Sequence, residues 1–286
     1  MKILLEQLKQ YRAITYRTNP NLILHSPKEA VDFINQRGFA FLWPIKDVEM
    51  PSLWTAVAGD RPVADDHDDP GHISWGWKDE MLDKRAWYYA RLLKNRNTFV
   101  SNKFAPYFYA LTPNYGSPEE DFYDQYHQGQ LPQETKLIFE TLLKEGPLDT
   151  LSLRKKAHLS GKSSNTPFTK ALDILQSDMR VLPVSIADAG RWHYAFVYEL
   201  THRYLPELGE QARAISEKLA RMKIVEKYLE SVGAASFHQV HSLFRWSKET
   251  TERTLDQLVN DGQVISGIEL EGSDTPGFAS IQFVSK

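Results

Sequence analysis

The second half of the chain contains an internal repeat, and this repeat limits the possible folds more than any other feature. Three segments match under nearly the same shift: 138–146 on 225–233, 153–160 on 240–247 and 172–181 on 255–264. The last match follows a turn that differs in length by four residues. Such self-similarity indicates two copies of one structural unit.

Each copy predicts a helix, a Gly-containing turn, a short helix, a Ser-led turn, a longer helix and a strand pair. The strand pairs are expected at 181–184 with 194–198, and at 264–268 with 279–284. Three helices followed by a β-hairpin form the winged helix-turn-helix arrangement. The segment 26–43, a helix that ends at Gly38 and runs into a strand, fits the start of a third unit. We therefore expect a mainly α fold with small β-hairpin wings, of the α+β class, built from tandem winged-helix modules.

Loop signals divide the chain into three expected domains. Pro113, Gly116 and Pro118 mark one loop and 129–132 another, so we place a boundary near residue 130. The expected domains are an N-terminal, winged-helix-like domain at 1–130 with an acidic loop and a basic helix, and winged-helix domains at 131–208 and 209–286. No stretch approaches the ~20 consecutive apolar residues of a membrane span. The N-terminus shows no secretory signal, which predicts a soluble cytoplasmic protein.

Composition excludes several kinds of chemistry and conceals a charge pattern. The chain has 286 residues and no cysteine, which excludes a disulfide scaffold, a thiolate nucleophile, a zinc ribbon and an iron–sulfur cluster. The formal net charge is −3. However, residues 47–83 hold ten Asp and Glu, while residues 84–103 hold six Lys and Arg and no acid. The small net charge therefore arises because these two segments cancel, and it is compatible with a basic surface that contacts nucleic acid.

Basic residues gather in two places. In 84–103 they surround the aromatic run 87–89, a pattern that suits a phosphate backbone and unpaired bases. We expect a helix at about 78–93, and the alternative is that its aromatic residues form a buried stripe while its charges line a solvated face. The second group of basic residues lies before the helix expected at 167–177 and in its first turns, and this helix would enter the major groove. The expected DNA-binding residues are Lys84, Arg85, Arg91, Lys94, Arg96, Lys103, Arg154, Lys155, Lys156, Lys162 and Lys170.

The corresponding helix of the second copy, at 248–260, carries mixed charge. It is a poor candidate for reading DNA, and we expect this module to suit a protein partner equally well.

Residues 65–72, Asp-Asp-His-Asp-Asp-Pro-Gly-His, form a candidate functional loop. Carboxylates and imidazoles can bind a divalent cation or act as a general base. The alternative is a solvated loop whose Asp and His residues cap the next helix. The candidate catalytic residues are Asp47, Asp66 and His67. No metal and no cofactor are expected, because the chain has no phosphate-binding loop, dinucleotide fingerprint or His-Glu-x-x-His sequence.

Four segments resemble the YcaQ/AlkZ-like family of tandem winged-helix proteins: 30–43 (AVDFINQRGFAFLW), 75–93 (WGWKDEMLDKRAWYYARLL), 146–183 and 194–206. Characterised members of this family are bacterial DNA glycosylases that unhook alkylated bases and interstrand crosslinks. The resemblance implies duplex DNA, plain or damaged, as the partner and nucleoid association in a bacterial cytoplasm. In that family a Gln-x-Gln or Gln-x-Asp pair, on the strand after an N-terminal helix, positions the attacking water. Phe41 and Trp43 occupy those positions here, and neither can orient a water or accept its proton.

Three hypotheses follow from these observations. The leading one is a monomeric tandem winged-helix DNA-binding protein that acts in damage recognition or repair. The second is an active DNA glycosylase that uses another carboxylate, Asp47 or Asp66. The third is a transcriptional regulator, a class of proteins that usually bind DNA as symmetric dimers.

Overall fold

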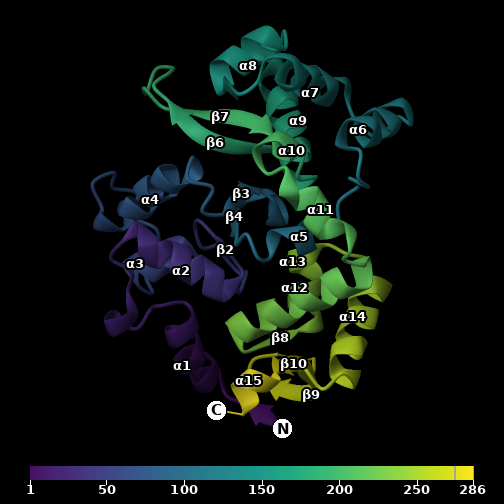
Figure 1. The fold of residues 1–286 in the computed structure, drawn as a ribbon. Coiled ribbons are helices and arrows are strands. Elements are labelled where there is room, and N and C mark those ends of the chain that lie inside the picture. Colours follow the sequence, from purple (N-terminus) through teal and green to yellow (C-terminus); the bar gives the residue numbers. More distant parts are fainter. Residues whose placement is uncertain (274, 286) are drawn as a thin grey trace.

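The same order of elements occurs three times along the chain (Figure 1). The structure is a computed structural model that describes residues 1–273 and 275–285, without the side chain of Lys162. Each unit consists of a helix, a short strand, two helices and an antiparallel strand pair. In each sheet the last strand of the unit lies between the other two. The three strand orders are β2 (Phe39–Phe41), β4 (Asn97–Val100), β3 (Tyr88–Arg91); β5 (Leu148–Asp149), β7 (Ala195–Leu200), β6 (Val181–Ala187); and β8 (Ala234–Ser236), β10 (Gly277–Ser280), β9 (Val264–Leu270). This is the winged-helix topology, so the expected mainly helical fold with β-hairpin wings is confirmed.

The first unit begins at a well-defined helix start. The Ser26 hydroxyl caps the helix by accepting from the backbone N–H of Glu29 at 3.2 Å, and Pro27 occupies the first helical position. Gly38, at φ +77°, ends the helix and turns the chain into the first strand. The elements of this unit are α2 (Pro27–Arg37), β2 (Phe39–Phe41), α3 (Leu53–Ala58), η2 (Pro70–His72), α4 (Ile73–Leu82), β3 (Tyr88–Arg91), η3 (Leu93–Asn95) and β4 (Asn97–Val100).

The expected basic helix at 78–93 is wrong. The structure ends α4 at Leu82 and forms β3 instead, so most of the basic segment 84–103 belongs to the wing of the first unit. Side chains of a strand alternate between the two faces of its sheet. Tyr88 packs into one hydrophobic cluster and Tyr89 into another, so both faces of this strand are buried. A strand buried on both faces has no polar alternation, and it therefore resembles a buried helix in sequence.

The second and third units correspond to the internal repeat. The helix expected at 167–177 starts two residues earlier, and the segment expected as a strand at 279–284 turns into a helix after Ser280. The second unit contains α7 (Gln133–Glu145), β5 (Leu148–Asp149), α8 (Thr150–Lys156), η4 (Lys162–Ser164), α9 (Asn165–Ser177), β6 (Val181–Ala187) and β7 (Ala195–Leu200). The third contains α12 (Glu217–Val232), β8 (Ala234–Ser236), α13 (Phe237–Phe244), α14 (Lys248–Asn260), β9 (Val264–Leu270), β10 (Gly277–Ser280) and α15 (Ile281–Val284).

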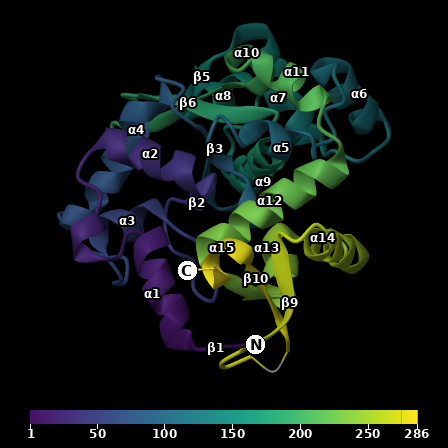
Figure 2. The ribbon, with the colours of Figure 1, turned by 60° about the horizontal axis from the view of Figure 1, so that its bottom comes forward.

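The start of the chain packs against its end (Figure 2). β1 (Lys2–Ile3) pairs in parallel with β9, and α1 (Leu5–Thr15) packs on α12, where the Tyr11 hydroxyl donates to the Glu230 carbonyl at 2.7 Å. The first 15 residues, which the expected boundaries assign to the N-terminal domain, therefore lie on the third unit. The remaining elements are η1 (Pro20–Leu22) and the connecting helices α5 (Ala105–Tyr109), α6 (Pro118–His127), α10 (Thr201–Tyr204) and α11 (Glu207–Arg213).

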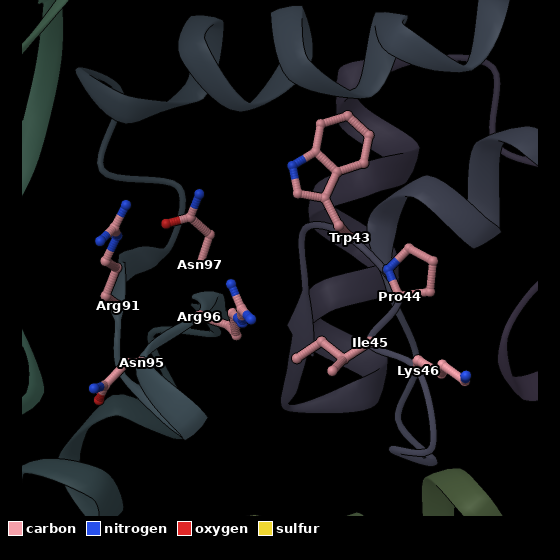
Figure 3. A pocket seen from close by; sticks show the side chains of 8 residues that line it. All are labelled: Trp43, Pro44, Ile45, Lys46, Arg91, Asn95, Arg96 and Asn97. Atoms are coloured by element: carbon pink, nitrogen blue, oxygen red, sulfur yellow. The ribbon is translucent and has the colours of Figure 1, made fainter. Parts of the chain in front are cut away.

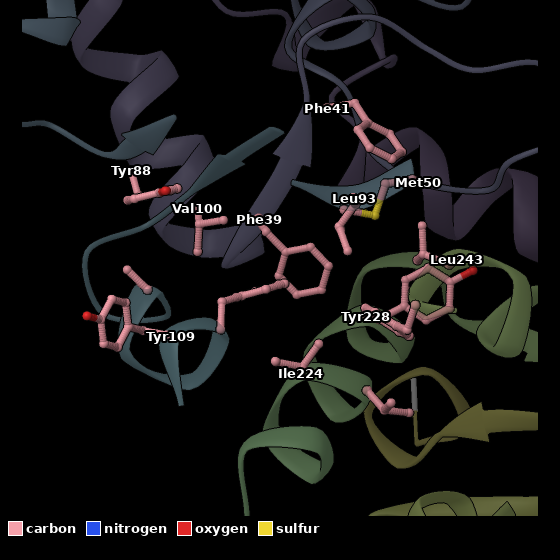
Figure 4. Packing of buried hydrophobic residues seen from close by; sticks show 14 of the residues in the cluster. Phe39, Phe41, Met50, Tyr88, Leu93, Val100, Tyr109, Ile224, Tyr228 and Leu243 are labelled. Carbon is pink, nitrogen blue, oxygen red and sulfur yellow. The ribbon is translucent and has the colours of Figure 1, made fainter. Parts of the chain in front are cut away.

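A shared hydrophobic core joins the first and third units (Figure 4). It packs Phe39 and Tyr88 of the first sheet with Ile224 and Tyr228 of α12. Burial of such aromatic and branched side chains fixes the units relative to one another. Within residues 1–273 and 275–285, every helix is too short or too polar to cross a lipid bilayer.

Candidate nucleic-acid interface

A cleft of about 470 Å³ opens between the wing of the first unit and the chain that follows β2 (Figure 3). Lys94 and Asn95, at φ +52° and +55°, adopt the left-handed conformation that turns the wing back on itself. This turn places residues 95–97 opposite 43–46. The lining residues are Trp43, Pro44, Ile45, Lys46, Arg91, Asn95, Arg96 and Asn97.

The lining of the cleft combines cations, amides and one indole. Lys46, Arg91 and Arg96 supply positive charge that attracts phosphate, and the amide of Asn97 can hydrogen-bond a base edge. The ring of Trp43 offers an aromatic face on which a base can stack. The eight lining residues include no carboxylate and no imidazole. The cleft is therefore suited to holding an anionic, aromatic ligand, and it supplies neither a carboxylate nor an imidazole for acid–base chemistry.

Arg91 connects this cleft to the longer helix of the second unit. Its Nη1 donates to both carboxylate oxygens of Asp173, at 2.9 and 3.2 Å, and its backbone N–H donates to Gln176 Oε1 at 3.1 Å. The C-terminal half of α9 is thus packed against the wing of the first unit. The N-terminal half remains exposed at Thr169 and Lys170, and this half can still approach a duplex.

The structure separates the six basic residues of 84–103 rather than gathering them in one patch. Arg96 is exposed at the rim of the cleft, beside Arg91. Lys94 does not line the cleft; its Nζ donates to the Ser242 hydroxyl of α13 at 2.9 Å. The wing tip therefore joins the first unit to the third.

The other three basic residues of this segment lie outside the cleft. Lys84 forms an ion pair with Glu80 at 2.7 Å, one turn away in the chain. The guanidinium of Arg85 lies 4.7 Å from the ring centre of Tyr204. Lys103 lines a separate cleft that also contains glutamates of α12.

The basic residues of the second unit have different surroundings. Lys155 and Lys170 are exposed, and Lys156 forms an ion pair with a glutamate at the end of α7. Arg154 is half-buried, and its Nη2 donates at 3.1 Å to a carbonyl of the loop after α8, which ties it to local structure. Lys162 lies in η4, and its side chain lies outside the described part of the structure.

The two positions aligned with the family's catalytic pair lie in different surroundings, one in the hydrophobic core and one at the cleft. Phe41 is 1% exposed and packs in the shared core (Figure 4). Trp43 lines the cleft, with its ring 5.2 Å from the centre of Trp54 and stacked on Trp75 at 6.1 Å. An indole thus occupies the cleft at the position aligned with the second residue of that pair.

None of the candidate catalytic residues lines the cleft. Asp47 follows the cleft residue Lys46 and is exposed. Asp66 and His67 are exposed in the acidic loop, where Asp66 accepts from a backbone N–H two residues later at 3.2 Å. Asp69 caps η2 by accepting from a backbone N–H at 2.7 Å, which fits the alternative of a solvated capping loop. Across the described residues, no group of three or more His, Asp and Glu side chains is placed to hold a metal ion.

Sequence reasoning missed a buried lysine next to this region. Lys78 of α4 is fully buried, with Nζ 4.2 Å from the ring centre of Trp75 and 4.4 Å from that of Phe196. Its Nζ donates to the Tyr194 hydroxyl at 2.9 Å and forms an ion pair with Asp79. Burial lowers the pKa of the Lys78 ammonium to about 8, although Asp79 opposes this shift.

This lysine holds the wing of the second unit on α4. The sequence signal was its position on the buried face of α4, four residues after Ser74 and four before Leu82. In a winged helix α4 would be the recognition helix, and here the wing of the next unit covers part of it. The cleft beside Trp43, rather than α4, is therefore the available surface of the first unit.

Fold and site together define a chain of three winged-helix units with a cationic, tryptophan-lined cleft. The model of the AlkZ-related family matches residues 24–245, more than half of the chain, so the protein belongs to the AlkZ-related family. Among solved structures, the chain is similar to the DNA glycosylase AlkZ of Streptomyces sahachiroi, with a TM-score of 0.62 and 13% sequence identity. The match covers 100% of this chain and 72% of that one, and at this identity it establishes a shared fold. No curated protein matches the sequence.

Proposed function

We propose that this protein binds duplex DNA in DNA repair and holds a damaged or unstacked nucleotide in the cleft at Trp43. The observation that carries the proposal is the lining of this cleft, with three cations, of which Arg91 is paired with Asp173, two amides and one indole. Its volume lies within the range of about 300–1,000 Å³ that is usual for small-ligand sites. Membership of the AlkZ-related family and the shared fold with a DNA glycosylase support the same role.

Recognition without base removal fits the chemistry of this cleft best. Cleavage of an N-glycosidic bond needs a group that orients or deprotonates water and stabilises a cationic sugar centre. Trp43 provides neither function, and the carboxylate of Asp173 is already bound by Arg91. The amides of Asn95 and Asn97 can orient a water, but they cannot take its proton or stabilise a cationic sugar. Stacking on an indole, by contrast, stabilises any exposed base by about 1–3 kcal/mol.

Fluorescence anisotropy with labelled duplexes tests the proposal. We expect wild-type binding to weaken steeply with salt, because each phosphate contact releases a counterion. Arg96→Gln should raise the dissociation constant about 3–10-fold and lower the salt slope by about one. Lys84→Gln is the matched control, since Lys84 is exposed and lies outside the cleft. Wild-type protein that shows no salt-sensitive binding to plain or alkylated duplex would refute the proposal.

The stacking role of Trp43 is tested separately. We expect Trp43→Leu to reduce the preference for a duplex with an abasic or alkylated site over a plain duplex, because the aromatic face is lost. Circular dichroism checks that the fold survives, and Trp43→Phe should retain part of the preference. An unchanged preference in a folded Trp43→Leu variant would exclude stacking in this cleft.

A second candidate function is active base removal by a DNA glycosylase. The position of Asp47, directly after the cleft residue Lys46, favours it over Asp66 as the carboxylate. An alkylated duplex is incubated with the protein, and abasic sites are then cleaved with alkali. Product that disappears in Asp47→Asn and persists in Asp66→Asn would establish this activity. Absence of product across several lesions would exclude it.

The assembly state follows from the same proposal. One chain already contains three winged-helix units, so we propose that it binds DNA as a monomer associated with the nucleoid of a bacterial cytoplasm. Size-exclusion chromatography with light scattering, with and without duplex, measures the number of chains. A symmetric dimer on a short palindromic duplex would instead support a transcriptional regulator.

A further inference from the structure

A second cationic cleft lies in the third unit, between α12 and α14. Its volume is about 230 Å³. Its lining contains three cations, two threonines, one glutamine and one methionine, and no carboxylate: Lys218, Arg221, Met222, Thr250, Arg253, Thr254 and Gln257. Taken over its whole length, α14 carries mixed charge, which makes it a poor candidate for reading DNA from sequence alone.

The tertiary structure sorts the mixed charges of α14 into two stripes. Positions 250, 253, 254 and 257 follow a spacing of three and four residues, and they share the face that meets α12. The acids of the helix, Glu249, Glu252 and Asp256, are exposed at other positions, and none of them lines the cleft. A mean charge computed over the whole helix therefore hides a cationic groove on one side.

The cations of this cleft have spare hydrogen-bonding capacity. In the described part of the chain, Lys218 and Arg253 form no ion pair and no side-chain hydrogen bond, and both are exposed. Arg221 pairs with Glu217 through Nη2 at 2.7 Å, while its Nε is buried with no hydrogen-bond partner among the described atoms. Glu217 thus pairs with one of the three cations, and Glu249, one turn before Arg253, acts on a second electrostatically without forming an ion pair.

We propose that the α12–α14 cleft binds phosphate groups of the DNA backbone. The proposal rests on the DNA binding proposed above, and it extends the contact from the first unit to the third. Guanidinium and ammonium groups that retain free N–H donors are the usual ligands of phosphodiester oxygens.

A set of contacts connects the two clefts. The wing tip that lines the first cleft reaches α13 through Lys94 and Ser242. The exposed Arg245 ends α13, and the guanidinium of Arg221 lies 5.8 Å from the ring centre of the next residue, Trp246. Side-chain contacts thus link the wing that lines the first cleft, through α13, to the helix α12 that lines the second.

Salt-dependent anisotropy on 12- and 24-base-pair duplexes tests the inference. On the longer duplex, we expect the double variant Lys218→Gln/Arg253→Gln to lose about two units of salt slope and about 10–100-fold in affinity. On the shorter duplex the loss should be smaller. Lys248→Gln is the matched control, since Lys248 is exposed on the same helix, pairs with Glu252 and does not line the cleft. If the wild type binds duplex and the double variant binds it as tightly as the Lys248→Gln control does, the inference is overturned and the proposed function stands.

Inorganic pyrophosphate distinguishes a DNA site from a site for free phosphates. We expect weak pyrophosphate binding, followed by NMR, that perturbs α12 and α14 in the wild type and is lost in the double variant. If the wild type binds pyrophosphate there but no duplex, the proposed function and the assignment to DNA both fail, and the cleft takes free phosphates. If the double variant binds pyrophosphate as the wild type does, the cleft is not the phosphate site.

Discussion

Replacing Lys78 by methionine should change how the stability of the protein depends on pH. Lys78 is fully buried between Trp75 and Phe196, where methionine has a similar length and no charge. Tyr194 donates to Asp79 at 3.0 Å independently of the lysine, so both groups keep a partner in the variant. The substitution therefore removes one buried ionisable group from the contact between α4 and the second wing.

The magnitude follows from the displaced pKa. In the unfolded chain the lysine releases its proton near pH 10.5, and in the folded protein burial lowers that pKa to about 8. Each pKa unit corresponds to about 1.36 kcal/mol, so the full effect is about 3.4 kcal/mol. Between these two values the unfolded chain binds more protons, and the stability of the folded protein rises with pH. From pH 7 to 9.5 the wild type should gain about 2 kcal/mol relative to Lys78→Met.

Urea unfolding of both proteins at several pH values measures this difference. Because only the difference is used, the titration of buried tyrosines in both proteins cancels. NMR of the lysine ε-carbons gives the pKa of Lys78 directly. A wild-type-to-variant difference that stays constant within about 0.5 kcal/mol from pH 7 to 9.5 would refute the reasoning, as would titration of Lys78 above pH 10.

Three further predictions concern single side chains. Asp173→Asn should raise DNA affinity about 2–5-fold in anisotropy, since it removes a negative charge beside the first cleft and releases Arg91 for phosphate; weaker binding would contradict this. Ser26→Ala should cost about 1 kcal/mol in urea unfolding because α2 loses its cap, and a cost below 0.3 kcal/mol would show that the cap contributes little. Gly38→Ala should cost about 1–2 kcal/mol, since φ is +77° and the new Cβ would lie 2.8 Å from Lys227 Cγ; a thermal melt at or above that of the wild type would argue against strain there.

The winged-helix units could be predicted from sequence because their signals are local. Ser26, Ser216, Ser236 and Ser247 each cap the helix that follows, and helical spacing of apolar residues marks the buried faces. Such signals depend on residues three or four apart. The second and third units share the apolar spacing, whereas the Ser caps named here belong to the first and third units. The repeat and the helix–strand order were therefore visible in one sequence.

The candidate site could be predicted only in part. The family resemblance drew attention to position 43, and Arg91 and Arg96 were named for their charge; the structure places all three at the first cleft. Asn97 and Lys46 gave no signal, since single polar residues in loops are common. The basic run 84–103 looked like one surface, but only Arg91 lies in a strand, and the turns and loops around β3 and β4 carry the other charges to different neighbours.

By itself, the sequence determined the repeated winged-helix unit, the absence of thiol chemistry and the cancellation of a basic segment by an acidic one. Only the tertiary structure decided which charges remain available to a ligand. Arg91 is bound by Asp173 of another unit, and Lys78 is buried under the wing of that unit. The physical reason is that helix capping and periodicity act over one or two turns, whereas burial and ion pairing depend on contacts between residues far apart in the chain.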